Sequence, residues 1–324
     1  MSRLVARCIV GAAGVALATT AAVAQNWPAK PVHVIVPLTA GSSADVIARR
    51  VAQRLSEQLG QPFIVENKPG AAGTIGVAAA AHAKPDGYTL LVHSSSYTIT
   101  PITYPGAPYD TLRDLAGVTP LTLLPQAVVV APGRGIESLG DLIARGKAKP
   151  DALTFGSAGV GTATHLSAER FRVAAGIDAL HVPFKGAEAV SEVIAGRIDF
   201  TVCPLIVCLP MIKDKRLVPL AMSSGQRSAR LPGLPTTLEL GVPNSNYDFW
   251  VGLFVPAQTP RDIVAKLHKE TVKALADPAV KESLTNVGAE QNLLEPAAFD
   301  QAIAREIASN TGLVKAAGIQ VNPK

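Results

Sequence analysis

The stretch VHVIVPLTAGSSADVIARRVAQRLSEQLGQPFIVEN, residues 32–67, decides the fold class. It opens with a short β-branched run, residues 32–37, which predicts a buried strand. A helix that ends at Gly60 is predicted next, because apolar residues recur at steps of four: Ile47, Val51, Leu55 and Leu59. FIVEN predicts a second strand. Strand, helix and strand in this order indicate an α/β protein with parallel strands.

The same alternation continues along the chain. GTIGVAAAAHA predicts a helix and YTLLVH a strand, and the pattern then restarts at QAVVVAP and runs to LVPLAM. The remainder is mostly helical, with start signals at Thr259-Pro260 and at Asp277-Pro278. We expect two open α/β lobes, joined by crossover strands near residues 119–125 and 249–255, with a ligand cleft at the hinge. The first lobe would comprise residues 25–123 plus 250–324, and the second residues 124–249.

Length and composition fit this picture. The chain has 324 residues, which suggests about two domains, and it is 48% apolar and 17% charged, as a folded protein is. Its net charge is +5, but Lys and Arg are scattered and not interleaved with aromatic residues. We therefore expect no nucleic-acid partner, because such binding needs basic charge gathered on one face.

The N-terminus has the pattern of an export signal. Arg3 and Arg7 precede an apolar run, and Ala22-Val23-Ala24 completes a small-residue cleavage motif. This pattern predicts a signal peptide, residues 1–24, cut after Ala24, and a location in the periplasm. A membrane anchor is the alternative, but the run is short for a span of ~20 residues. Two cysteines follow the signal, Cys203 and Cys208, and either a bridge or, by preference, two buried thiols would suit them.

Four loops at predicted strand ends share a Gly-, Ser- and Thr-rich composition: residues 37–45, 93–98, 156–165 and 184–189. In open α/β sheets, ligands bind beyond the carboxyl ends of the strands. Free N–H groups and the partial positive charge of a helix N-terminus favour an anion there. The candidate ligand-binding residues in these loops are Leu38, Thr39, Ala40, Gly41, Ser42, Ser94, Ser95, Ser96, Ser157, Gly159, Gly161, Thr162, His165 and Lys185.

Several of these residues admit a structural role instead. Ser42 and Asp45 fit a helix-capping box, so Ser42 either caps its own helix or contacts the ligand. Asp45 is expected to cap the helix, to orient the loop or to meet an ammonium group of the ligand, if the ligand has one. His165 suits a core or cap position as well as a ligand contact, and Lys185 suits either a surface position or a ligand cation.

Enzyme motifs are lacking. The stretch from Gly159 to Thr164 lacks the last glycine of a dinucleotide-binding motif, and GSAG is not a nucleophile elbow. The six histidines do not have metal-ligand spacing. We therefore expect no catalytic residue, cofactor or metal. A periplasmic hydrolase using Ser157 or Ser94 with His165 or His93 is kept as an alternative that no motif supports.

The chain resembles the Bug-type receptors, the extracytoplasmic solute-binding subunits of tripartite tricarboxylate transporters. The matching stretches include WPAKPVHVIVPLTAGSSADVIARR, AKPDGYTLLV, FGSAGVGTATHLSAE, HVPFKG, GRIDF and FWVGLFVPAQTP, in order over nearly the whole chain after the signal. The resemblance implies a type II periplasmic-binding-protein fold. It also implies that backbone amides, hydroxyls and water hold a ligand carboxylate.

Two departures from the family pattern bear on the ligand. Leu38, Thr39 and Ala40 replace a proline-rich part of the first loop, with Ser42 in place of a glycine. After GRIDF, where the family often has an acidic or amide residue, the chain has Thr201-Val202-Cys203-Pro204. This places Cys203 at the cleft and indicates a ligand with an apolar or aromatic body.

The function predicted is the capture of a small organic carboxylate for uptake. The partners expected are the membrane permease subunits of a tripartite tricarboxylate transporter or, as the alternative, a sensor protein that recognises the closed receptor. A monomer is expected, because the cleft must open and close freely.

Overall fold

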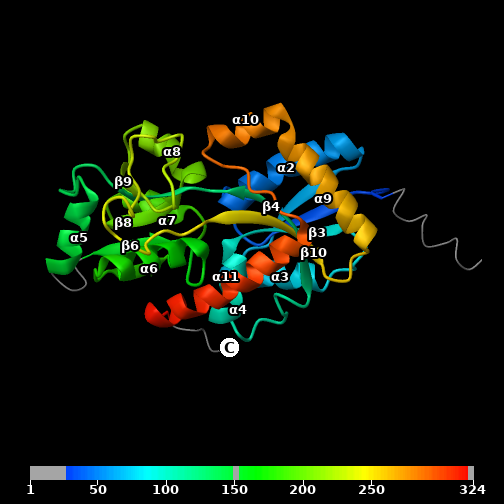
Figure 1. The fold of residues 1–324 in the computed structure, drawn as a ribbon, viewed down its shortest axis with the longest axis horizontal. Coiled ribbons are helices and arrows are strands. Elements are labelled where there is room, and N and C mark those ends of the chain that lie inside the picture. The colour runs from blue at the N-terminus through cyan, green and yellow to red at the C-terminus, as the bar shows by residue number, and fades with distance from the viewer. Residues whose placement is uncertain (1–26, 149–152, 320–324) are drawn as a thin grey trace, which may run out of the picture.

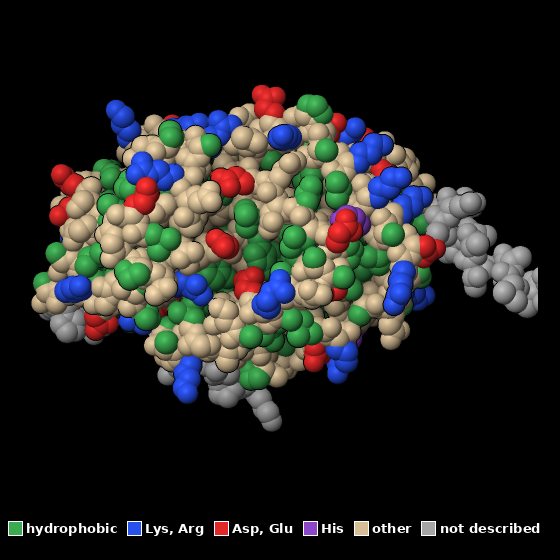
Figure 2. Space-filling model, in the orientation of Figure 1, with side chains coloured by type: hydrophobic (Ala, Val, Ile, Leu, Met, Phe, Trp, Pro, Cys, Tyr) green, Lys and Arg blue, Asp and Glu red, His purple; other side chains and the backbone are tan. Residues whose placement is uncertain are grey.

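The computed structural model describes residues 27–148 and 153–319. The predicted signal peptide and its cleavage after Ala24 lie outside these residues. In the parts described, every helix is too short or too polar to cross a membrane. On the face shown in Figure 2, Lys and Arg side chains are interspersed with Asp and Glu and form no patch of one sign.

The first sheet has the strand order β2-β1-β3-β10-β4. Strand β1 pairs in parallel with β2 and β3, and β10 runs antiparallel to β3 and β4. The strands are β1 (Val32–Val36), β2 (Phe63–Asn67), β3 (Thr89–Ser94), β4 (Leu115–Leu123) and β10 (Trp250–Pro256). The helices between them are α2 (Ser43–Leu59), η1 (Ala71–Gly73), α3 (Thr74–Ala81), η2 (Ser95–Thr98) and α4 (Thr100–Thr103).

The second sheet repeats this arrangement with the order β7-β6-β8-β5-β9. Here β6 is parallel to β7 and β8, whereas β5 is antiparallel to β8 and β9. Its strands are β5 (Gln126–Val130), β6 (Thr154–Ser157), β7 (Leu180–Pro183), β8 (Phe200–Pro204) and β9 (Val218–Met222). Its helices are α5 (Leu139–Ala148), α6 (Ala163–Ala175), α7 (Glu188–Ile194) and α8 (Leu205–Lys213).

The chain passes between the sheets twice, once from β4 to β5 and once into β10 (Figure 1). The two passages are held together, since the Leu124 N–H donates to the Phe249 carbonyl at 2.7 Å. The prediction of a two-lobed α/β fold is confirmed. We propose that residues 25–123 plus 250–324 form the first lobe and residues 124–249 the second, because the chain leaves one sheet and enters the other at these passages.

Three C-terminal helices complete the molecule: α9 (Arg261–Ala276), α10 (Pro278–Asn286) and α11 (Pro296–Ala316). Helix α9 packs on α2 and β4, and α11 runs along β4 toward α6 of the other lobe (Figure 1). Asp277 caps α10 as predicted. The predicted cap at Thr259 is wrong. Its hydroxyl donates to the Pro256 carbonyl at 2.7 Å instead, and Pro260 occupies the cap position of α9.

The amphipathic face predicted for residues 43–59 packs into the first lobe. Ile47, Val51 and Leu55 are buried against the apolar side chains of the first sheet. Each such side chain contributes about 1.5–3 kcal/mol on burial. Since α2 is fixed along its length in this way, its N-terminus is held at the end of β1.

Glu306 of α11 lies beneath η2, at the base of the loop that follows β3. Its carboxylate accepts from the Trp250 indole at 2.7 Å and pairs with the Thr98 hydroxyl at 3.0 Å. The Thr98 hydroxyl also donates to the Ser95 carbonyl at 2.8 Å, so its single proton is shared. Burial raises the pKa of Glu306 to about 6, although these hydrogen bonds act in the opposite direction.

Replacing Glu306 with glutamine should flatten the pH dependence of stability. A carboxyl with a raised pKa binds its proton more tightly in the folded state, so its stabilisation is complete below the ordinary value of 4.5 and is lost as pH rises through about 6. Glu306→Gln should therefore exceed the wild type at pH 7 by about 1–2 kcal/mol. Urea unfolding at pH 4.5, 5.5 and 7 measures this, with the exposed Glu282→Gln as control. A wild-type slope retained in Glu306→Gln would contradict the assignment.

Candidate ligand site

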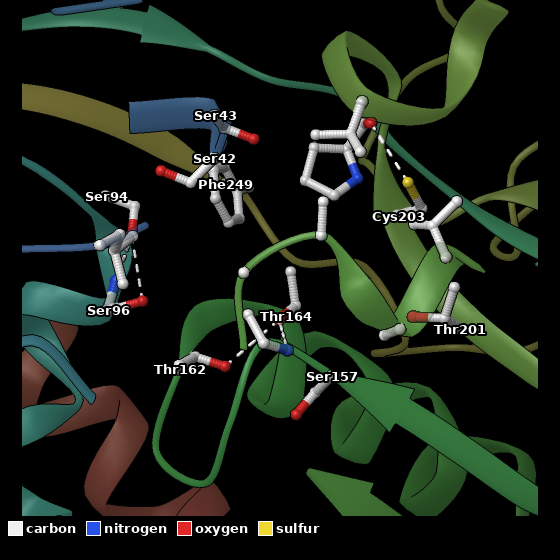
Figure 3. A pocket seen from close by; sticks show the side chains of 18 of the residues that line it. Ser42, Ser43, Ser94, Ser96, Ser157, Thr162, Thr164, Thr201, Cys203 and Phe249 are labelled. Carbon is white, nitrogen blue, oxygen red and sulfur yellow. Dashed lines mark hydrogen bonds between the residues drawn. The ribbon is translucent and has the colours of Figure 1, made fainter. Parts of the chain in front are cut away.

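A cavity between the two lobes encloses about 590 Å³, counting the space at its open mouth. It is built from the ends of β1, β3, β6 and β8 and the helices that follow them, together with the loop after β7, the start of α7 and Phe249. Side chains from both lobes face one space (Figure 3). None of the side chains that line it carries a charge. They are Leu38, Ser42, Ser43, Ala44, Ser94, Ser96, Ser157, Ala158, Thr162, Thr164, Gly186, Ala187, Ala189, Val190, Thr201, Val202, Cys203, Pro204, Val207 and Phe249.

The N-terminus of α2 forms one wall. Ser42 is its N-cap, with its hydroxyl accepting from the Asp45 N–H at 3.4 Å. The Asp45 carboxylate accepts from the Gly41 N–H at 2.9 Å rather than from Ser42, so only half of the predicted capping box forms. No acceptor among the described residues takes the N–H groups of Ser43 and Ala44, both of which line the cavity. Ser42 thus caps the helix and also faces the cavity.

Asp45 holds this loop in place. Its other carboxylate oxygen accepts from Arg49 Nε at 3.0 Å and from Asn67 Nδ2 at 2.9 Å. Burial raises the pKa of Asp45, but the hydrogen bonds from Arg49, Gly41 and Asn67 outweigh it, so the pKa is lowered overall. The carboxylate is therefore charged and held by these three donors, and Asp45 is not among the residues that line the cavity.

The N-terminus of α6 forms the facing wall. Thr162 is its N-cap and accepts from the His165 N–H at 3.4 Å. The next N–H, of Ala163, donates across the cleft to the Ser96 hydroxyl at 2.9 Å. The Thr164 N–H has no acceptor in the described parts of the chain. Each helix N-terminus carries about half a positive charge, so two such ends face one cavity that has no charged side chain.

The lobes are in contact around the cavity. Besides the pair of Ser96 and Ala163, two glycines of the second lobe approach threonines of the first. A Cβ on Gly161 would lie 2.5 Å from the Thr103 hydroxyl, and one on Gly186 would lie 2.1 Å from that of Thr39. Both glycines have positive φ, at 76° and 57°. Glycine is thus required here for conformation and for the close approach of the lobes.

The structure places the predicted site residues in three groups. The cavity itself is lined by Leu38, Ser42, Ser94, Ser96, Ser157, Thr162 and Cys203. A wider hollow at its mouth is lined by Leu38, Thr39, Gly159 and Lys185. The remaining predicted residues line neither the cavity nor the hollow: Ala40, Gly41, Ser95, Gly161 and His165.

His165 belongs to this last group because its side chain turns back toward the loop. It is buried, and its Nδ1 accepts from the Gly161 N–H at 3.2 Å. Its ring stacks on His181 with 3.8 Å between centroids.

Thirteen of the twenty residues that line the cavity were not among the predicted candidates, and they include Ser43, Ala44, Thr164, Thr201 and Phe249. The first three are opening residues of helices that follow the predicted loops, so a helix-cap signal one or two positions earlier would have found them. Thr201 lies inside a strand, and its hydroxyl donates to the Gly156 carbonyl at 2.8 Å. Phe249 comes from the second passage between the lobes, and no local pattern marks it.

The cysteines are free thiols in the structure, and both are buried. Burial raises the pKa of the Cys203 thiol well above its ordinary value. The preferred interpretation, two buried thiols, is confirmed. Within residues 27–148 and 153–319, no cluster of three or more His, Cys, Asp or Glu side chains is suited to hold a metal ion.

Known proteins resemble this chain along most of its length. The model of the tripartite tricarboxylate transporter family receptor matches residues 47–319. The UPF0065 protein from the tcbD–tcbE intergenic region of Pseudomonas sp. strain P51 is 35% identical, over 85% of this chain and 84% of its own. Protein BugT of Bordetella pertussis is 34% identical over 99% of each chain.

Solved structures agree with these relatives. Rpa4515 of R. palustris with adipate is 30% identical, with a TM-score of 0.87 over 91% of this chain and 99% of its own. The periplasmic binding protein BugD is 29% identical, with a TM-score of 0.85 over the same shares. MatC of Rhodopseudomonas palustris with bound malate is 28% identical, with a TM-score of 0.83 over 89% of this chain and all of its own.

Asp45→Asn should destabilise the protein although it keeps the size of the side chain. An amide accepts at one oxygen only, so one of the three donors around Asp45 would face an N–H group. We expect a loss of about 1–3 kcal/mol in the free energy of unfolding at pH 7. Because the pKa of Asp45 is lowered in the fold, this difference should shrink as pH falls below the ordinary value of 3.8. Urea unfolding measures it, with the exposed Asp178→Asn as control. Equal stability of the two variants would contradict the bracing role.

Proposed function

This chain belongs to the tripartite tricarboxylate transporter receptor family, and we propose that it captures a small organic carboxylate in the periplasm and delivers it to the membrane permease subunits of such a transporter. The family is one of solute-binding receptors, so the chain is a receptor and not an enzyme. Two of its structural relatives hold carboxylates, adipate and malate.

One observation carries the proposal. Ser43, Ala44 and Thr164 line one cavity that no charged side chain lines, and their N–H groups have no acceptor in residues 27–148 and 153–319. A hydrogen bond to a charged group is worth about 1.5–3 kcal/mol, and a partly buried helix N-terminus adds up to about 2 kcal/mol for an anion. A carboxylate satisfies these donors, whereas a cation or an apolar molecule leaves them unpaired. Anion capture is therefore the function that the geometry favours.

The remaining walls bear on the body of the ligand. Val190, Val202, Pro204, Val207 and Phe249 contribute apolar walls to the cavity. We therefore propose an acid with an aliphatic or aromatic body. A second carboxylate would face the wider hollow at the mouth, where Lys185 supplies a cation.

Closure of the lobes would remove the carboxylate from water and strengthen its hydrogen bonds. The closed form is also the form that a permease would recognise, because only the liganded receptor populates it strongly. A sensor protein would use the same closed surface. A pull-down with the liganded receptor, which identifies permease or sensor, separates these two partners. We propose a monomer, since the hinge must move freely.

A thermal-shift panel tests the proposal. The protein without the predicted signal peptide would be melted in the presence of hexanoate, benzoate, adipate or malate. The corresponding amide of each acid serves as its uncharged control. A ligand at ~100 times its Kd adds about 2.7 kcal/mol to the free energy of unfolding. We expect a clear shift with at least one acid and none with its amide. Equal shifts for acid and amide, or no shift with any acid, would reject the anion clamp.

Gly161→Ala should hinder closure, whereas Gly176→Ala should not. Both glycines have positive φ, 76° and 61°, so alanine strains the backbone similarly. Only at position 161 does the new Cβ meet the other lobe, since the nearest atom to a Cβ at position 176 is 4.0 Å away. With the acid that stabilises the wild type most, Gly161→Ala should bind at least about tenfold more weakly. Equal affinity of the two variants in calorimetry would count against closure around this glycine.

A further inference from the structure

Within the described residues, Ser157 is the one cavity hydroxyl that lies within hydrogen-bond distance of a histidine ring. It ends β6, and its Oγ lies 2.7 Å from Nε2 of His181 on the neighbouring strand β7. The Gly159 N–H also donates to this oxygen, at 3.1 Å. We infer that His181 is a positioning residue: its Nε2–H donates to Ser157 and so turns the Ser157 hydroxyl proton into the cavity, toward the ligand carboxylate. This inference rests on the proposed function and assigns a specificity-determining role to a residue that does not line the cavity.

The argument is a count of protons. A serine hydroxyl has one proton and two lone pairs. The Gly159 N–H occupies one lone pair, and a proton on His181 Nε2 occupies the other. The hydroxyl proton is then left for the Gly159 carbonyl, which accepts it at 3.2 Å in this structure, or for a ligand oxygen in the cavity that accepts it at a shorter distance. If His181 instead carried its proton on Nδ1, Nε2 would take the serine proton and Ser157 would offer the ligand no donor.

The surroundings keep the His181 ring in place and uncharged. It stacks on His165 with 3.8 Å between centroids and 15° between planes, and on Phe155 with 4.9 Å and 24°. Burial, with a contribution from His165, lowers the pKa of His181 to about 3. The ring is therefore neutral at ordinary pH, and the tautomer, not the charge, decides what Ser157 can do.

Two features favour the Nε2–H tautomer. In the described parts of the chain, no protein group hydrogen-bonds Nδ1 of His181, whereas Nε2 lies 2.7 Å from the Ser157 hydroxyl oxygen. His165 is different, because its Nδ1 accepts from the Gly161 N–H and its Nε2–H faces Glu169 at 3.6 Å. In addition, a chain from imidazole N–H through the hydroxyl to a carboxylate is cooperative, since each bond polarises the next. An anionic ligand thus reinforces the tautomer that recognises it.

The first arm of the test uses the free protein. Ser157, Gly159 and His181 all belong to the second lobe, so their arrangement does not require closure. Nitrogen-15 NMR of histidine-labelled protein at pH 7 should show His181 as the Nε2–H tautomer, and the signal, assigned by its loss in His181→Gln, should shift in Ser157→Ala. An Nδ1–H tautomer would overturn the inference whether or not any acid binds.

The second arm uses variants and the panel acid with the largest thermal shift. His181→Met removes the donor and should weaken acid binding about tenfold or more, the value of a hydrogen bond to a charged group. His181→Gln keeps an N–H donor and should restore affinity to within about threefold. In a Ser157→Ala background, His181→Met should have no further effect, because His181 acts through Ser157.

The outcomes separate the two proposals. Additive losses in the double variant, or failure of glutamine to restore binding in a protein that melts like the wild type, would overturn the role of His181. If no acid in the panel binds the wild type, the carboxylate function fails, and the NMR result alone decides the tautomer.

Discussion

The arrangement on which the rest of the structure depends is a pair of helix N-termini that open onto one cavity without a charged side chain. Helices α2 and α6 begin there, one in each lobe, and nothing in the described part of the chain accepts from the N–H groups of Ser43, Ala44 and Thr164. Buried N–H groups need acceptors. The protein thus has N–H donors already arranged to bind an anion, and much of the surrounding structure holds the two helix N-termini in place.

The supports differ between the lobes. In the first lobe, Asp45 ties its own loop to Arg49 and Asn67 and keeps its negative charge away from the cavity. In the second lobe, Thr162 caps α6, and Nε2 of the His181 ring lies within hydrogen-bond distance of the Ser157 hydroxyl. The lobes then meet where Ser96 accepts the Ala163 N–H, so closing the cleft pairs one more N–H of α6. Ligand binding and closure therefore draw on the same small set of donors.

The features that could be predicted from the sequence are those that depend on local patterns of residues. Two α/β lobes could be predicted from the four-residue spacing from Ile47 to Leu59 and from the β-branched strands. The Gly-, Ser- and Thr-rich loops indicated which strand ends meet at the cavity. Sequence reasoning could not place Phe249, because the position of this residue depends on how distant strands pair. His165 was grouped with the loop by its proximity in sequence, yet its Nδ1 turns back to Gly161. His181 was passed over because it lies within a predicted strand, and only the parallel pairing of β6 and β7 brings it to Ser157.

The most direct test of the central claim is a crystal structure of the protein with a bound acid. The account predicts that the carboxylate oxygens lie within ~3.2 Å of the main-chain nitrogens at the starts of α2 and α6, with no Lys or Arg nitrogen within ~4 Å of them. It also predicts the body of the acid against Val202 and Phe249. A single carboxylate bound at the mouth on Lys185, with the N–H groups of Ser43, Ala44 and Thr164 facing only water, would contradict it.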